Sequence, residues 1–254
     1  MTTPPPPESA GKRRRLLLRA STRRDIETGL PVSLELAAAL QSELAALFVA
    51  EDAMLAASAL PFPALVGFSG GTLTPDPARF EAALRREAES CRQLLAQAAE
   101  RARLAWSFES LRGEAGRVLR EASSLEDILV IGLDQLATPL DETIAKAREL
   151  APRRGGVLLV RQGPLRRQGP LIVVERPGVT ADDLKRLAET LADALGARVA
   201  HLKEEAVGSS AELEAARLLL APIESPMLED TAALRRLRMR LRAPLLLLRT
   251  AEER

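Results

Sequence analysis

The stretch FESLRGEAGRVLREASSLEDILVIG, residues 108–132, predicts a strand, a helix and a second strand in direct succession. Apolar and polar side chains alternate over 104–111, as is typical of a strand with one buried face. Gly113 leads into a helix over 114–124, and the apolar run 128–131 ends at Gly132. Because a strand that is apolar throughout is buried on both faces, this stretch predicts a parallel sheet covered by helices.

The same alternation extends in both directions from this stretch. The N-terminal part predicts strands at 16–18 and 44–50 and helices at 25–42 and 78–103, and the C-terminal side adds a helix at 139–150 and a strand at 157–160. Right-handed crossovers between such strands produce a doubly wound sheet. Residues 12–162 are therefore predicted to form one α/β domain of five strands.

The pattern starts again after the segment RQGPLRRQGP at 161–170. The second pass predicts a smaller sheet that lacks one helix–strand pair, with strands at 171–174, 198–202, 218–221 and 245–248 and helices at 180–195, 211–216 and 229–241. The predicted fold class is α/β, with two doubly wound, Rossmann-like parallel-sheet domains in tandem. The predicted division is a disordered Pro-rich tail at 1–11, a first domain at 12–162, a linker at 163–170 and a smaller domain at 171–254.

The composition excludes several classes of function. The net charge is only +1 and aromatic residues make up 2% of the chain, so neither a polyanion-steering field nor a base-stacking platform is expected, and no nucleic-acid partner is predicted. The single cysteine, Cys91, allows no internal disulfide and favours a cytoplasmic location. The longest weakly polar stretch, 53–68, is interrupted by Pro61, Pro63 and Gly67, so no transmembrane segment is expected.

The order of elements, with ALFVAEDAML at 46–55 and GVLLV at 156–160, resembles the universal stress protein fold. PLIVVERPGVTADDLKRLAETLADALG at 170–196 is similar to the start of a second copy, as in tandem members of that family. The resemblance implies a role in stress regulation. It also implies that the two copies pack against each other through their last strands, 157–160 and 245–248.

The nucleotide-binding branch of that family carries an acidic residue at the end of its first strand. After the fourth strand it has the pattern Gly, two residues, Gly, nine residues, Gly, then Ser or Thr. Glycines suit this position because backbone N–H groups approach phosphate closely only where no Cβ intervenes. Here Ser21 replaces the acidic residue, Gly132 matches the first glycine, and Gln135, Ala145 and Lys146 occupy the other positions. No cofactor is predicted, and ATP binding is not expected.

Two interpretations of the first strand's end remain open. Ser21, Thr22 and Arg23, together with Gly132 and Gln135, could hold an anion in a degenerate pocket, because open α/β sheets bind ligands at such strand ends. Alternatively, the same segment is a capping loop that begins the first helix, which is the interpretation that we favour.

No catalytic or metal-binding arrangement is visible in the sequence, so the chain is not predicted to be an enzyme. His201 is expected at a surface or edge position, and Cys91 on the apolar face of its helix is expected to be buried and inert. Arginines 235, 236, 238, 240 and 242 are expected on the solvated face of a helix whose leucines face the core.

Segment 53–77 is too apolar for an ordinary surface loop. Its candidate partner-contact residues are Met54, Leu60, Phe62, Leu65 and Phe68. It could form a lid, dock a second chain or touch a membrane partner, or it could simply cover its own sheet edge. The sequence thus predicts a non-enzymatic regulatory or adaptor protein whose partner is another protein or a second copy. The alternative is a small-ligand or nucleotide sensor with a remodelled pocket near Ser21 and Gly132.

Overall fold

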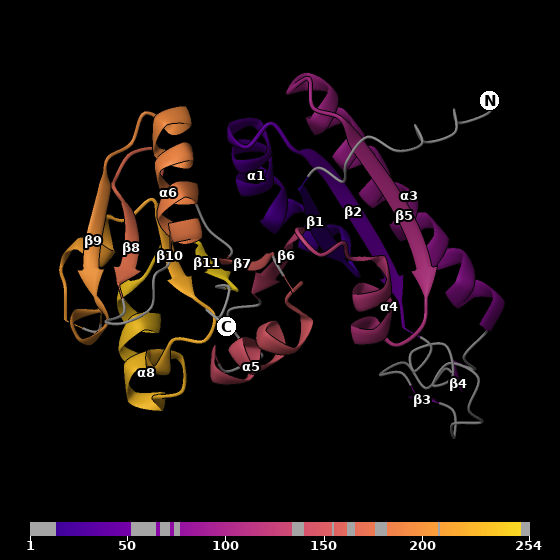
Figure 1. Cartoon of the computed structure of the whole chain (residues 1–254). Coiled ribbons are helices and arrows are strands. Elements are labelled where there is room, and N and C mark those ends of the chain that lie inside the picture. The colour runs from indigo at the N-terminus through magenta and orange to yellow at the C-terminus, as the bar shows by residue number, and fades with distance from the viewer. Residues whose placement is uncertain are drawn as a thin grey trace.

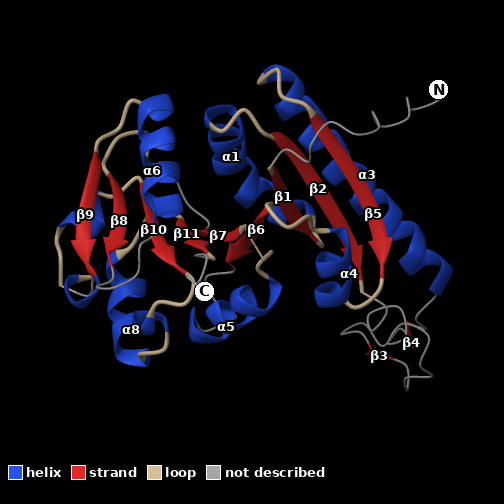
Figure 2. Ribbon diagram, viewed as in Figure 1, coloured by secondary structure: helices blue, strands red, loops and turns tan. Residues whose placement is uncertain are grey.

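The computed structural model describes residues 14–51, 77–133, 140–153, 155–161, 166–175, 182–207 and 209–249, and two short strands at 65–66 and 72–73. These residues build a nine-stranded sheet with helices on both of its faces (Figures 1 and 2). Below, the first half means the described residues up to 161, and the second half those from 166 onward.

The strands of the sheet follow one continuous spatial order, β5-β2-β1-β6-β7-β11-β10-β8-β9. The first half contributes five parallel strands, namely β1 (Arg15–Ala20), β2 (Glu43–Ala50), β5 (Trp106–Arg112), β6 (Ile128–Leu133) and β7 (Gly156–Arg161). The second half contributes four, namely β8 (Leu171–Glu175), β9 (Val199–Lys203), β10 (Leu218–Pro222) and β11 (Leu245–Leu248). Each predicted strand is confirmed, with ends that differ by one or two residues.

The two halves meet where β7 pairs with β11, the one antiparallel pair in this sheet. Leu159 lies opposite Leu245, and Leu158 lies opposite Leu246. A Cβ built at Gly156 would come within 2.5 Å of the Leu247 carbonyl oxygen, so the close approach at the end of this pair requires glycine. The pairing of 157–160 with 245–248 that the family resemblance implied is therefore observed. We call this pair and the helices beside it the junction.

Helices cover the two faces of the sheet as two layers. On one face, the core contains side chains of α1 (Arg23–Ala39), α3 (Pro77–Arg101) and α6 (Asp182–Leu195). On the other face, it contains side chains of α4 (Ala115–Ala122), α5 (Leu140–Leu150), α7 (Glu212–Ala215) and α8 (Thr231–Arg240). Both cores run through the junction without interruption. α3 begins one residue before the predicted start and ends two residues before the predicted end.

Part of segment 53–77 differs from the loop that the sequence predicted. β3 (Leu65–Val66) and β4 (Thr72–Leu73) pair antiparallel as a separate two-stranded sheet (Figure 1). Two-residue strands are too short to show the alternating pattern on which strand prediction depends, and so the prediction missed them.

The described part of the second half has no counterpart to α3 and β5, which agrees with the missing helix–strand pair that the sequence predicted. The strand order places β9 at one edge of the sheet and β5 at the other. His201 lies on the edge strand β9, where its Nδ1 is 3.0 Å from a carboxylate oxygen of Glu175, and its side chain is about half exposed. This agrees with the predicted edge position.

Arginine side chains connect the two halves across the junction. Arg148 in α5 donates to the carbonyl oxygens of Ile223 and Ser225 at 3.0 and 3.3 Å. Arg161 at the end of β7 donates to two carbonyl oxygens at the C-terminal end of α8. Arg217, before β10, donates to Glu35 in α1 at 3.1 Å. Because guanidinium groups offer several donors in a fixed plane, each arginine can bind more than one acceptor at once.

Candidate functional site

The end of β1 forms a complete helix cap. Thr22 is the N-cap of α1, and its side-chain oxygen accepts a hydrogen bond from the backbone N–H of Asp25 at 3.3 Å. The Asp25 carboxylate accepts in return from the backbone N–H groups of Ser21 and Thr22, at 2.8 and 2.9 Å. This reciprocal arrangement is the capping box that stabilises helix starts. The backbone N–H groups of these two predicted pocket residues therefore already bind a carboxylate of the same chain.

Arg23 is held on the side of α1 that faces α3. Its backbone N–H donates to Glu87 at 2.6 Å, and its side chain donates to Glu27 at 2.8 Å and to the Ser90 hydroxyl at 3.1 Å. The hydrogen bond to Glu27 raises the pKa of Arg23 above its ordinary value. Arg23 is thereby engaged by two carboxylates and a hydroxyl.

Gly132 lies in β6 beside α1, so the structure does bring it close to the Ser21 loop. A Cβ at this position would lie 3.5 Å from Thr28 Cγ2 and 3.9 Å from the Asp25 carbonyl oxygen. These are ordinary van der Waals distances, so crowding does not explain this glycine. Gln135, the remaining residue of the predicted pocket, lies outside the described residues.

The predicted partner-contact residues are mostly outside the described part of the chain. Met54, Leu60, Phe62 and Phe68 are not described, and for Leu65 the structure gives only its place in β3. Lys146, which occupies the position where the family pattern has Ser or Thr, lies in α5.

Cys91 is fully buried in α3, as predicted. Burial, with smaller contributions from the negative charges of Glu87 and Asp25, raises the pKa of its thiol to about 12. Since thiolate is the reactive form of cysteine, the thiol is inert at neutral pH.

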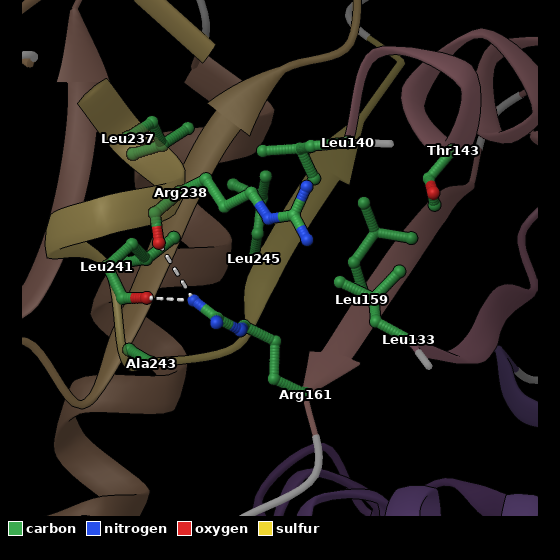
Figure 3. Close-up of a pocket in the computed structure, with 10 residues that line it drawn as sticks. All are labelled: Leu133, Leu140, Thr143, Leu159, Arg161, Leu237, Arg238, Leu241, Ala243 and Leu245. Carbon is green, nitrogen blue, oxygen red and sulfur yellow. Dashed lines mark hydrogen bonds between the residues drawn. The ribbon is translucent and has the colours of Figure 1, made fainter. Parts of the chain in front are cut away.

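A cleft that the sequence did not predict lies at the junction. β6, β7 and α5 from the first half and α8 and β11 from the second half line its apolar interior, which encloses about 40 Å³ (Figure 3). Its lining residues are Leu133, Leu140, Thr143, Leu159, Arg161, Leu237, Arg238, Leu241, Ala243 and Leu245.

Two arginines flank this cleft. Arg161 Nη1 donates to the carbonyl oxygens of Arg238 and Leu241, at 3.0 and 2.9 Å, which ties β7 to the end of α8 (Figure 3). Burial, followed by the positive charges of Arg242 and Arg238, lowers the pKa of Arg161 below its ordinary value. Leu234 and Leu237 of α8 are buried and Arg238 is exposed, in agreement with the predicted helix faces.

The cleft is suited to binding more than to chemistry. Thr143 supplies the one hydroxyl among its ten lining residues, which include no carboxylate, imidazole or thiol. The sequence analysis missed the cleft because its two walls are about 75 to 110 residues apart in the chain and meet only through the β7–β11 pairing. The sequence features that belong to this cleft are the apolar run of β11 and Arg161 at the end of β7. Neither feature by itself indicates a cavity.

The described residues contain neither a cluster of metal-ligand side chains nor a helix suited to span a membrane. No group of three or more His, Cys, Asp or Glu side chains in that part of the chain is placed to hold a metal ion. Within the same residues, no helix combines the length and the apolar character needed to cross a bilayer.

Comparison with known proteins identifies the fold. No protein-family model and no curated protein sequence matches the chain. Among solved structures, the chain resembles a universal stress protein from Archaeoglobus fulgidus DSM 4304 with a TM-score of 0.57 and 13% identity, over 96% of this chain and 98% of that one. It also resembles the cytoplasmic domain of a prokaryotic cation chloride cotransporter, with a TM-score of 0.54 and 15% identity over 95% and 98% of the two chains. The chain therefore has a universal-stress-like α/β fold.

Proposed function

We propose that the chain is a non-enzymatic regulatory or adaptor protein that acts through protein–protein contacts in the cytoplasm. The observation that carries this proposal is the Asp25 carboxylate, which accepts from the N–H groups of Ser21 and Thr22. A nucleotide phosphate at this strand end would meet a negative charge where it needs free donors. The glycines that could supply other donors are missing at 135 and 145.

A tandem origin of the two halves belongs to the same proposal. The second half has the strand order β9-β8-β10-β11, which repeats the order β2-β1-β6-β7 of the first half. Under this correspondence α6 is the counterpart of α1, and α8 is the counterpart of α5. The two copies would act as one unit because their cores are continuous at the junction.

The exposed edge of β5 supports the proposal of a protein partner. This partner would be another protein or a second copy of this chain. Among the described residues, β5 pairs on one side only, and its last four residues, from Glu109 to Arg112, are exposed. Unpaired strand edges offer backbone donors and acceptors to a partner strand. The other candidate contact, segment 53–77, lies between β2 and α3 in the chain.

An NMR spectrum that resolves single glycines tests whether the chain binds nucleotide. The chain has 15 glycines, so selective ¹⁵N-glycine labelling gives a simple amide spectrum in which Gly132 reports on the predicted pocket. The proposal predicts that millimolar Mg-ATP leaves the Gly132 resonance in place. A saturable shift of Gly132 would show that the strand end binds nucleotide and would overturn the proposal.

Deleting residues 56–72 tests the contact role of that segment. The expected result is loss of the partner, or of self-association, in crosslinking of purified protein and in co-purification. Replacing Leu111, which is 38% exposed on β5, with Ser provides a matched test of the strand edge. If both variants retain every interaction of the unmodified chain, neither surface is the contact.

A second candidate function, small-ligand sensing, is favoured by the cleft of Figure 3. An apolar wall beside two arginines suits a small apolar group that carries an anionic head. This candidate predicts that such a ligand stabilises the junction. A thermal-shift screen of short-chain carboxylates on the unmodified chain and on Leu159→Phe, which would fill the cleft, tests it.

A further inference from the structure

A second and larger groove lies at the junction, on the sheet face that α1 and α6 cover. It has a volume of about 610 Å³ and is lined by residues of both halves. From the first half come Arg14, Leu40, Glu126 and Arg153, and from the second half come side chains of α6 and the end of β11. The groove opens at the N-terminal ends of β1, β6 and β7, opposite to the strand end that carries Ser21 and Gly132.

Arginines dominate the charge of this groove. Arg186 is paired with Asp183 at 3.2 Å, so these two charges offset each other. Within the described residues, Arg14 and Arg153 form no ion pair, and Glu126 is the remaining carboxylate of the lining. Arg249 adds a third cation, so three positive charges face one negative charge.

Arg249 carries an unmatched donor. Its Nη2 donates to the Arg148 carbonyl oxygen at 3.0 Å, and its backbone N–H donates to Gly155 at 3.1 Å. Its Nε is buried and has no hydrogen-bond acceptor among the described residues. A buried N–H of a charged group without an acceptor is costly, and the Nε atoms of Arg19 and Arg217 are in the same state.

Part of the groove lining is apolar. Leu40, Leu187 and Leu248 line it, and Leu187 and Leu248 are buried in the core. A volume of about 610 Å³ lies within the range of small-molecule sites. A ligand that fills this groove therefore needs an anionic group for the arginines and an apolar body for the leucines.

We propose that this groove binds a small organic phosphate, with the phosphate on Arg14, Arg153 and Arg249 and an apolar or aromatic body on the leucines. Arginine suits phosphate because its planar guanidinium donates two parallel hydrogen bonds to adjacent oxygens. The site exists only where the two halves meet, so binding links them. This inference is independent of the proposed function, because the groove and the Ser21 loop lie at opposite ends of β1.

Titration of ¹⁵N-glycine-labelled protein with phenyl phosphate tests the inference. Gly155 is the reporter, because its carbonyl oxygen accepts from the Arg249 N–H and it lies two residues after Arg153. The expected result is a saturable shift of Gly155, with Gly132 unchanged and with no such shift from sodium chloride at equal ionic strength. Inorganic phosphate is expected to bind at least about threefold more weakly, because it has no apolar body.

Two variants make the test specific. Arg14→Gln combined with Arg153→Gln is expected to weaken phenyl phosphate binding about tenfold or more, because charge-assisted hydrogen bonds are lost. Neither arginine has an ion-pair partner in the described chain, so the fold is expected to persist, which circular dichroism checks. Arg198→Gln removes an exposed arginine outside the groove and is the matched control, with affinity expected within about twofold of the unmodified chain.

Three results would overturn the inference. These are a Gly155 resonance that does not move, a double variant that binds as tightly as the unmodified chain, and inorganic phosphate that binds as tightly as phenyl phosphate. A shift of Gly132 would instead contradict the proposed function, so the two failures are distinguishable.

Discussion

The Ser21 loop and the junction groove differ in how their polar groups are used. At the loop, the Asp25 carboxylate binds the two N–H groups of Ser21 and Thr22, and Arg23 binds Glu27 and Ser90. In the groove, Arg14 and Arg153 have no ion-pair partner within the described chain, and the Nε of Arg249 is buried without an acceptor. At the strand end the helix cap therefore occupies the backbone donors of Ser21 and Thr22, whereas two arginines of the groove have no ion-pair partner among the described residues.

The largest expected effect comes from breaking the junction itself. Leu246 is fully buried in β11 opposite Leu158. Leu246→Ala is expected to destabilise the chain by about 2–5 kcal/mol, because it leaves a cavity in a core shared by both halves. Chemical denaturation measures this change, with Leu125→Ala as control, since Leu125 is 56% exposed. A loss below about 1 kcal/mol would mean that the halves do not depend on this contact.

A smaller effect is expected from the arginine that ties α5 to the second half. Arg148→Ala removes the donors to the Ile223 and Ser225 carbonyl oxygens, so it is expected to cost about 1–3 kcal/mol. Arg117→Ala is the control, because its ion pair with Glu121 is 3.8 Å long and exposed. Equal stability of the two variants would argue against Arg148 as a tie between the halves.

The strand-end loop is expected to be less sensitive than the junction. Thr22→Ala removes the side-chain acceptor for the Asp25 N–H and is expected to cost about 1 kcal/mol, whereas Thr22→Ser retains the cap. Thermal denaturation of both variants measures the difference. If Thr22→Ala is neutral and also creates ATP binding, the loop is a masked ligand site instead of a simple cap.

The smallest effect concerns α3, which has no described counterpart in the second half. Burial raises the pKa of Cys91 to about 12 from its ordinary value of 9.0. The folded state holds the thiol proton while the unfolded chain releases it above about pH 9, so stability present below that pH is lost as pH rises toward about 12. Between about pH 8 and pH 9.5, the expected loss is less than about 1 kcal/mol.

Cys91→Ala provides the control for this pH dependence. The variant is expected to lack the cysteine contribution to the alkaline loss, although its stability at pH 8 falls slightly. Urea denaturation at the two pH values measures both quantities. An identical pH dependence in the variant and the unmodified chain would show that Cys91 is not the responsible group.

Most of the fold was predictable from the sequence, because continuous apolar runs such as 128–131 and 157–160 mark strands of a parallel sheet. The runs do not indicate the spatial order of these strands, and the family resemblance implied only that 157–160 and 245–248 lie together. The strands β3 and β4 were missed because two residues show no periodicity.

The sites at the junction were much harder to predict. The loop at Ser21 could be interpreted locally, since Thr22 and Asp25 have capping-box spacing. By contrast, Arg14, Arg153 and Arg249 are far apart in the chain and meet only through tertiary structure. In an arginine-rich sequence with 36 basic residues, no local signal separates these three from ordinary surface arginines.

The central claim is that the strand end beside Gly132 is occupied by its own cap and does not hold a nucleotide. A crystal structure of the full chain grown with excess Mg-ATP tests it most directly. We expect the Asp25 carboxylate within hydrogen-bond distance of the Ser21 and Thr22 N–H groups, and no nucleotide density against Gly132. An ATP molecule with its phosphates beside Gly132 and with Asp25 turned away would contradict it.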